Sequence, residues 1–364
     1  MMLNRGKRGV ALDLRSAEGR DVVRTLLKDA DVVVENFRVG TMEKMGLGWA
    51  ELSELNPRLV YCQITGFGRS GPLSVHGGFD LIAQGYSGLM SITGEGPGRE
   101  PVKVGAPVTD ITAGILAAFG VATALVERAR TGRGRLVDTS LFEAGITQTY
   151  WQSAIALATG DSPGPLGSAH PLAAPYQAFR TADGWINVGA SNEPTWGGLL
   201  RALERPELGE DARFRTNGDR MENLAALVAE LSPLFEERTS DAWLSALAGE
   251  GVPAGPIASV GEMLEHPHTR ARGMVVEVEH PMSGRVRSLG GPVKMWGDDA
   301  PEPGDGAGEE AGASGAGGSD PNAPAHGGAP APTLGQHTRE VLGEAGYDQE
   351  AIDALVSSGV AVTG

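Results

Sequence analysis

The sequence lacks the residues from which several kinds of site are built. Among its 364 residues there is a single cysteine, Cys62. One cysteine cannot form an internal disulfide framework or a metal site made of several thiolates. Because Cys62 lies in an apolar run, residues 59–64, we predict that it is a buried structural thiol.

The chain also lacks an excess of positive charge, since its formal net charge is −16. Nucleic acids and anionic membranes are recruited by a positive field, so this charge argues against both as general partners. No stretch reaches the roughly 20 uninterrupted apolar residues of a spanning helix. The N-terminus shows no apolar core of a signal peptide. We therefore expect a cytoplasmic protein without nucleic-acid or membrane partners.

The composition is that of an ordinary globular chain, with 41% hydrophobic and 21% charged residues. Its length allows two domains or one large one. The 54 glycines are partly explained by one biased segment, residues 297–333, made almost entirely of Gly, Ala, Pro, Ser, Asp and Glu. Such a segment cannot bury enough apolar surface to order itself, so we predict a flexible linker.

The first half of the chain alternates between β-like apolar runs and helical patterns. We expect strands near residues 10–14, 31–37, 59–64 and 134–140, with Ser16 capping the helix after the first run. This rhythm predicts an α/β fold with a Rossmann-like, wound parallel sheet. The first domain is placed at residues 1–180.

Ligands of such sheets bind where the strands end, which is where residues 36–38 and 65–67 would lie. These two loops are candidate ligand walls, and ordinary turns between strand and helix are the alternative. The sequence contains no Walker motif and no proper dinucleotide fingerprint.

A smaller α+β domain is expected at residues 181–296. It would contain a hairpin at 182–184, an amphipathic helix from Leu224 to Phe235 and a β pair near 274–278 and 285–289. Residues 334–364, after the linker, would form a helical tail that returns to the first domain. His170, before this domain, is more often structural than catalytic in such a position.

The stretch 103–114 is extended, punctuated by glycine and proline, and delivers the carboxylate of Asp110 to the start of an apolar helix. Ile111, Ile115 and Phe119 recur at helical spacing, and we expect the helix to be buried. Unpaired N–H groups at a helix start favour an ionised carboxylate that could attack a carbonyl. The alternative is that Asp110 simply caps the helix.

These segments together resemble the class III CoA-transferase family, which includes formyl-CoA transferase, carnitine CoA-transferase and 2-methylacyl-CoA racemase. The likeness is carried by residues 4–8, 35–37, 46–48, 66–68, the Asp110 segment, 131–134, 175–179 and 334–338. Residues 101–105, 167–170 and 175–179 look most like the branch that handles dicarboxylates, such as succinyl-CoA:glutarate CoA-transferase.

The resemblance implies a CoA-transferase in which Asp110 is the catalytic nucleophile and forms an anhydride and then an aspartyl-CoA thioester. The family's glycine-containing mobile loop, which assists catalysis, matches Gly167 and Ser168. Acyl-CoA and a carboxylic acid are implied as substrates, with no further cofactor. Family members form interlocked homodimers, and the same is expected here.

The family's CoA contacts fall on three basic side chains, Arg15, Arg38 and Lys44, that would give an acidic protein its local basic patch. The full set implied by the resemblance is Leu12, Asp13, Leu14, Arg15, Asn36, Phe37, Arg38, Lys44, Met45 and Phe79.

Two departures from the family pattern leave alternatives open. Racemases have Gly-His-Asp where this chain has Gly78-Phe79-Asp80, and phenylalanine cannot supply the second base; a racemase is the alternative enzyme. Family members also begin with a further strand and helix, whereas this sequence begins after them. The start therefore lies upstream, or the protein is a shortened CoA-binding remnant without activity.

Overall fold

A computed structural model describes residues 2–297 and 329–364. The chain divides into two units, which we name the sheet unit (31–42 and 57–257) and the terminal unit (1–30, 43–56 and 258–364). The expected linker, residues 297–333, falls mainly on 298–328, which lie outside the described residues. The domain limits expected from the sequence stay a prediction.

The sheet unit is built on three parallel strands in the order β2-β3-β4. Their bounds are β2, Val32–Glu35; β3, Val60–Thr65; and β4, Leu136–Ser140. The prediction of an α/β fold with a parallel sheet is confirmed. Cys62 is fully buried in β3, and burial, followed by the charges of Glu35 and Asp138, raises the pKa of its thiol. The prediction of a buried structural thiol fits this inert environment.

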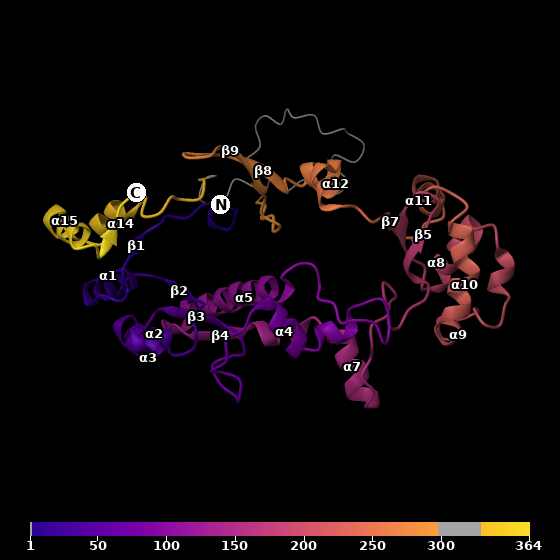
Figure 1. Cartoon of the computed structure of the whole chain (residues 1–364), viewed down its shortest axis with the longest axis horizontal. Helices are drawn as coiled ribbons and strands as arrows, with labels where there is room; N and C mark the ends of the chain where they lie inside the picture. The colour runs from indigo at the N-terminus through magenta and orange to yellow at the C-terminus, as the bar shows by residue number, and fades with distance from the viewer. Residues whose placement is uncertain (1, 298–328) are drawn as a thin grey trace. The chain divides into compact units, whose positions relative to one another are not determined.

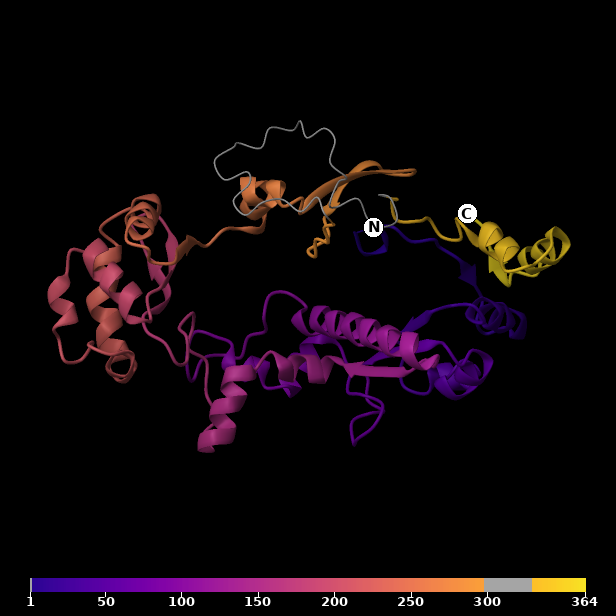
Figure 2. The ribbon, with the colours of Figure 1, turned by 180° about the vertical axis from the view of Figure 1, so that it is seen from behind.

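Helix α5, Val108–Thr131, lies along this sheet (Figures 1 and 2). Its contact face is made of small residues, with Ala113, Ala117 and Ala124 buried. The expectation of a buried helix is wrong for the opposite face, where Ile111 and Phe119 are 53% and 71% exposed. A single sheet covers only one side of a helix, so a helix that is apolar all round keeps an uncovered stripe.

By length and composition α5 could also cross a bilayer, with a mean hydropathy of 1.7 over its most apolar part. Among residues 2–297 and 329–364 it is the only helix of this kind. One such helix is weak evidence for a membrane span, since core helices of soluble proteins share these properties.

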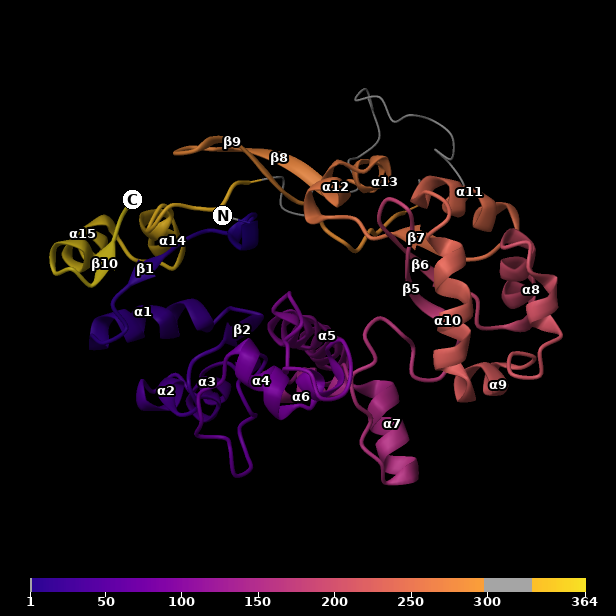
Figure 3. The ribbon, with the colours of Figure 1, turned by 45° about the vertical axis from the view of Figure 1, so that its right-hand side comes forward.

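Helices α4, Asp80–Tyr86, and α6, Leu141–Thr147, pack beside α5, and α7, Tyr150–Thr159, follows α6 along the chain. Later residues of the sheet unit form a second core, with helices on a three-stranded antiparallel sheet (Figure 3). Its elements are β5, Tyr176–Arg180; β6, Trp185–Gly189; α8, Glu193–Ala202; α9, Asn217–Glu222; α10, Leu224–Phe235; α11, Ser240–Gly249; and β7, Ala254–Pro256. The predicted hairpin and the predicted helix from Leu224 to Phe235 are both confirmed.

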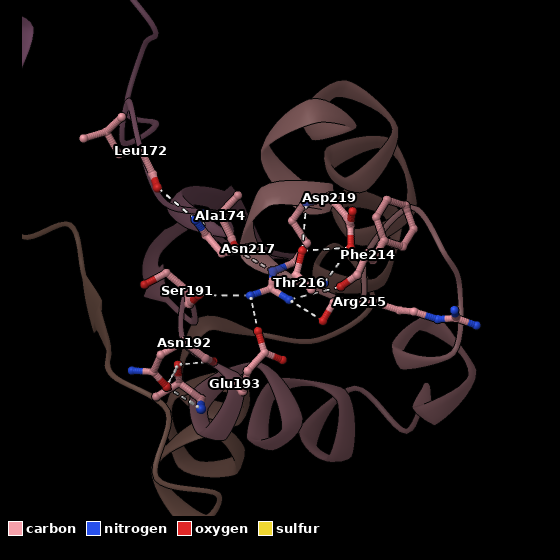
Figure 4. Close-up of polar contacts among 12 residues, drawn as sticks. Leu172, Ala174, Ser191, Asn192, Glu193, Phe214, Arg215, Thr216, Asn217 and Asp219 are labelled. Carbon is pink, nitrogen blue, oxygen red and sulfur yellow. Dashed lines mark hydrogen bonds and ion pairs between the residues drawn. The ribbon is translucent and has the colours of Figure 1, made fainter. Parts of the chain in front are cut away.

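A fully buried arginine, Arg220, joins the segments around this second core. Its guanidinium donates to the carbonyl oxygens of Ala174 at 2.7 Å, Phe214 at 3.0 Å and Ser191 at 2.9 Å, among the contacts drawn in Figure 4. Glu193 lies 3.3 Å away as a partner for its charge. The buried cation is therefore compensated by several acceptors, as burial of a charge requires.

The terminal unit contains the two ends of the chain. Its elements are β1, Ala11–Leu12; α1, Ala17–Leu27; α3, Trp49–Leu55; α12, Val260–Glu265; α13, Pro267–Ala271; β8, Val275–His280; β9, Gly284–Leu289; α14, Thr338–Glu344; α15, Gln349–Ser357; and β10, Ala361–Val362, while α2, Thr41–Lys44, crosses the limit between the units. The β8–β9 hairpin confirms the predicted β pair. Ser16 caps α1 by accepting from the N–H of Gly19, as predicted.

Strand β1 does not open the parallel sheet, so that expectation is wrong. It pairs antiparallel with β10 (Figure 3), and the N–H of Asp13 donates to the carbonyl of Val360 at 2.8 Å. The C-terminal tail also holds the N-terminal segment through His337, whose Nδ1 accepts from the N–H of Gly9 at 3.0 Å. The backbone groups of this short strand are thus satisfied by the far end of the chain.

Candidate active site

A cavity of about 460 Å³ opens where β2 and β3 end and α5 begins. Both loops expected as ligand walls contribute to it, and so does Asp110. Phe67, the last residue of the second loop, is instead buried in an edge-to-face contact with Tyr86. The lining is Asn36, Phe37, Arg38, Val39, Ile64, Thr65, Gly66, His76, Gly77, Gly78, Phe79, Asp110, Gly114 and Leu141.

The wall that follows β2 is fixed by two hydrogen bonds. The side-chain amide of Asn36 donates to the carbonyl of Ile64 at 2.6 Å, which ties the end of β2 to the end of β3. The N–H of Phe37 donates to the carboxylate of the buried Glu35 at 2.7 Å. The side chains of residues 36–38 are therefore presented from an anchored turn.

A second wall, residues 76–79, reaches the cavity through a close backbone crossing. A Cβ on Gly66 would lie 2.8 Å from the nitrogen of Gly78, and a Cβ on Gly78 would lie 2.8 Å from the Cα of Gly66. Only glycine fits at either position. Sequence reasoning missed the wall's His76, Gly77 and Gly78, and the glycines of both segments were its only signal.

Asp110 does not cap its own helix, so that alternative is wrong. It is the third residue of α5, whose N-cap is Pro107. The cap comes from α4, because Oδ1 of Asp80 accepts from the N–H of Thr109 at 3.0 Å and from its hydroxyl at 2.8 Å. Within the described part of the chain, the Asp110 carboxylate has no hydrogen-bond partner.

The surroundings raise the pKa of Asp110, first through burial against the cavity wall and then through the negative charge of Asp80. The sequence-based expectation was that the helix start would favour the ionised form. The structure opposes it because partial burial, and then the negative charge of Asp80, disfavour the ionised form. The carboxylate is therefore more basic than an ordinary aspartate.

Arg38 brings a guanidinium to the same lining. Its side chain lies beside Gly77, where a Cβ would come within 3.7 Å of the guanidinium. In the described ranges Arg38 forms no ion pair, so its charge is available to an anion. The cavity thus combines an unpaired carboxylate, that of Asp110, with an unpaired cation, that of Arg38.

The family model of CoA-transferase family III matches residues 1–306. The chain belongs to CoA-transferase family III. A protein of Fusarium pseudograminearum named acyl-CoA transferase is 38% identical over 360 residues, covering 98% of this chain and 73% of that protein. Human succinyl-CoA:glutarate CoA-transferase is 34% identical over 361 residues, covering 99% and 76%. The prediction of a CoA-transferase enzyme is confirmed.

Among solved structures, a CaiB/BaiF family protein from Brucella suis has the same fold with a TM-score of 0.74. It is 37% identical to this chain, and the match covers 94% of this chain and 82% of that one. The α/β fold of a class III CoA-transferase is therefore supported by sequence and by structure.

The predicted CoA contacts of this CoA-transferase fall into both units. Asn36, Phe37, Arg38 and Phe79 line the Asp110 cavity, whereas Leu12, Asp13, Leu14, Arg15, Lys44 and Met45 belong to the terminal unit. Within that unit Arg15 pairs with Asp13 at 2.9 Å, and this hydrogen-bonded ion pair lowers the pKa of Asp13.

The two residues of the predicted catalytic loop, Gly167 and Ser168, are not in the lining of the Asp110 cavity. Gly167 borders another cavity, of about 540 Å³, and its N–H donates to the carbonyl of Gly94 at 2.8 Å. The hydroxyl of Ser168 accepts from the N–H of Ala178 at 3.0 Å. Both residues therefore already have backbone partners in this structure.

Proposed function

We propose that the protein transfers CoA from an acyl-CoA to a free carboxylic acid, with Asp110 as the covalent nucleophile. The observation that carries this proposal is the unpaired Asp110 carboxylate in a cavity that also contains Arg38. Asp80 performs the helix-capping task, so Asp110 is available for chemistry. Membership of CoA-transferase family III supports the same reaction class.

The first half of the reaction loads CoA onto the enzyme. A carboxylate oxygen of Asp110 attacks the thioester carbon, the carbon–sulfur bond breaks, and CoA leaves as a thiolate. The product on the enzyme is a mixed anhydride. The thiolate then attacks the Asp110 carbonyl carbon, the donor acid leaves as a carboxylate, and an aspartyl-CoA thioester remains.

The second half reverses these steps with the acceptor. The acceptor carboxylate attacks the aspartyl thioester, which releases CoA thiolate and forms a new anhydride. The thiolate attacks the acceptor's acyl carbon, and Asp110 leaves as a free carboxylate. Every bond that breaks is replaced by one of similar energy, so no cofactor besides CoA is needed, provided that water is excluded.

Arg38 is assigned to an anionic group of the CoA substrate, with Asn36, Phe37 and Phe79 as neighbouring contacts. The six predicted CoA contacts of the terminal unit keep their proposed role in CoA binding; they are Leu12, Asp13, Leu14, Arg15, Lys44 and Met45. Gly167 and Ser168 keep their proposed oxyanion role, which requires the Gly167 N–H to leave the carbonyl of Gly94.

A dicarboxylate is the proposed acceptor, with succinyl-CoA as the donor. The name of the human relative, succinyl-CoA:glutarate CoA-transferase, supports this choice. Screening glutarate against a monocarboxylate of equal length tests the assignment.

We also propose a cytoplasmic homodimer. The uncovered stripe of α5, formed by Ile111, Ile115 and Phe119, supports the dimer because these side chains are 53%, 64% and 71% exposed. Light scattering of the wild type and of Ile115→Asp measures the assembly. A monomeric wild type contradicts the dimer.

The transferase proposal is tested by intact mass after incubation with succinyl-CoA, followed by peptide mapping. We expect an acyl or CoA adduct on the Asp110 peptide and none in Asp110→Ala. Asp138→Asn is the matched control, because burial also raises the pKa of that carboxyl but it lies outside the cavity lining. CoA binding without any adduct would instead support the inactive remnant.

A racemase acting on 2-methylacyl-CoA is the second candidate, favoured by one observation. Phe79 cannot act as a base, but His76 lines the same cavity and carries an imidazole. Proton exchange at the α carbon in deuterated water, measured without an acceptor acid, identifies this activity. The transferase proposal predicts no exchange that depends on His76.

A further inference from the structure

Gln84 of α4 is a fully buried polar side chain that holds two segments at once. Its amide nitrogen donates to Oδ2 of Asp80 at 2.7 Å, one helical turn earlier. Its amide oxygen accepts from the N–H of Val104 at 2.9 Å. Both ends of the amide are therefore engaged, which fixes its orientation.

The second oxygen of Asp80 continues this chain of bonds. Oδ1 accepts from the N–H and from the hydroxyl of Thr109, at 3.0 Å and 2.8 Å. Thr109 is fully buried. One connected network thus runs from Val104 through Gln84 and Asp80 to the residue directly before Asp110.

This network contacts the approach to α5 at both ends. Residues 105–107, between Val104 and Thr109, are Gly, Ala and Pro and are exposed. They contribute little packing that could hold the segment in place. The position of Asp110 in the cavity therefore depends on the two bonded ends of the approach.

We propose that Gln84 is a positioning residue for the nucleophile. It holds the Asp80 carboxylate in the orientation that caps Thr109, and it anchors Val104, so that the Asp110 carboxylate faces the cavity. This inference rests on the proposed function of Asp110. Without Gln84, the Asp80 carboxylate loses a donor and the partly buried N–H of Val104 loses its acceptor, and both segments are released.

The test compares Gln84→Met with wild type in the rate of adduct formation on Asp110 at saturating succinyl-CoA, and in CoA affinity by calorimetry. Methionine has a similar volume and no hydrogen-bonding amide. We expect the adduct to form about 10- to 100-fold more slowly, because a small misplacement of a reacting group has effects of this size. CoA affinity should stay within about twofold of wild type, since Gln84 is outside the cavity lining.

Gln148→Met is the matched control. Gln148 donates to the hydroxyl of Thr112, which like Thr109 is on α5, at 3.0 Å, but Gln148 lies on the exposed surface. The adduct rate of this variant should equal that of wild type. A reduced rate in both variants would show that any loss of contact with α5 has the same effect, and would contradict the positioning role.

A second pair of variants keeps the test decisive if Gln84→Met fails to fold. Thr109→Val removes the hydroxyl that Asp80 accepts from, and Thr109→Ser retains it. The serine variant should recover the adduct rate that the valine variant loses. Equal rates in the pair, or a wild-type rate in folded Gln84→Met, overturn the inference, whereas a wild type that forms no adduct overturns the proposed function itself.

Discussion

The starts of α1 and α5 are capped in two different ways. At α1, Ser16 stands directly before the helix and its hydroxyl accepts from the N–H of Gly19. At α5 the cap is the carboxylate of Asp80, which comes from another helix. At α1 the capping side chain comes from the residue directly before the helix. At α5 it comes from another helix, so the carboxylate in the first turn of α5 is not needed for capping. Asp110 is free for this reason.

This difference predicts the largest effect for Asp80→Ala. Removing the carboxylate leaves the buried N–H of Thr109 without its acceptor, which should lower the free energy of unfolding by about 2 kcal/mol. Adduct formation on Asp110 should slow by about 100-fold. Urea unfolding and quenched-flow mass spectrometry measure the two effects. An unchanged adduct rate would show that Asp110 needs no support from α4.

A smaller effect is expected for Arg38→Gln, which leaves both helix caps intact. Loss of one charged hydrogen bond should weaken CoA binding by about tenfold. Isothermal titration with CoA is the measurement. The control is Arg99→Gln, since Arg99 borders a different cavity of the sheet unit and pairs with Glu95 at 3.7 Å. Equal losses in both variants would contradict a specific role for Arg38.

The third prediction concerns pH. Burial, and then the charge of Asp80, raise the pKa of Asp110, and attack requires the ionised carboxylate. As the pH is lowered, the adduct rate should therefore begin to fall at a pH above the ordinary aspartate pKa of about 3.9. Asp80→Asn removes the charge and leaves the burial, so this acid limb should move to lower pH. If the acid limb stays at the same pH, the charge of Asp80 does not raise the pKa of Asp110.

The same raised pKa has a consequence for stability. The folded state binds the Asp110 proton more tightly than the unfolded state, so the ionised carboxylate opposes folding at neutral pH. This cost disappears as pH falls through the folded pKa. Asp110→Asn should accordingly be at least as stable as wild type at neutral pH, which thermal unfolding checks.

The smallest effect is expected for Ser16→Ala at the locally capped helix. Loss of this cap should lower the free energy of unfolding by about 1 kcal/mol. The adduct rate of the folded variant should not change, because α1 belongs to the terminal unit and carries no residue of the cavity lining. A slowed rate in the folded variant would show that this cap supports the reaction, and would contradict the prediction.

The features that could be predicted from the sequence depend on neighbouring residues. The helix from Leu224 to Phe235, the Ser16 cap and the hairpins each follow from a local pattern of apolar or turn residues. The ligand-wall loops could be predicted as well, because parallel strands end at the same edge of a sheet.

The features that could not be predicted depend on distant segments. The cap of α5 needs Asp80, the crossing of Gly66 with Gly78 needs two loops, and β1 needs its partner β10. A pattern of residues around Asp110 contains no information about these partners. The exposure of the apolar stripe of α5 could not be predicted for a related reason. The apolar residues of a helix do not show which other segment packs against them.

Labelled oxygen tests whether Asp110 carries the acyl group during transfer. The protein is incubated with succinyl-CoA and a dicarboxylate whose carboxyl oxygens are ¹⁸O, and the Asp110 peptide is then analysed by mass spectrometry. In the proposed sequence the bridging oxygen of the second anhydride stays on Asp110, so each turnover leaves a labelled oxygen there. We therefore expect a labelled Asp110. Labelled acyl-CoA product together with an unlabelled Asp110 would contradict it.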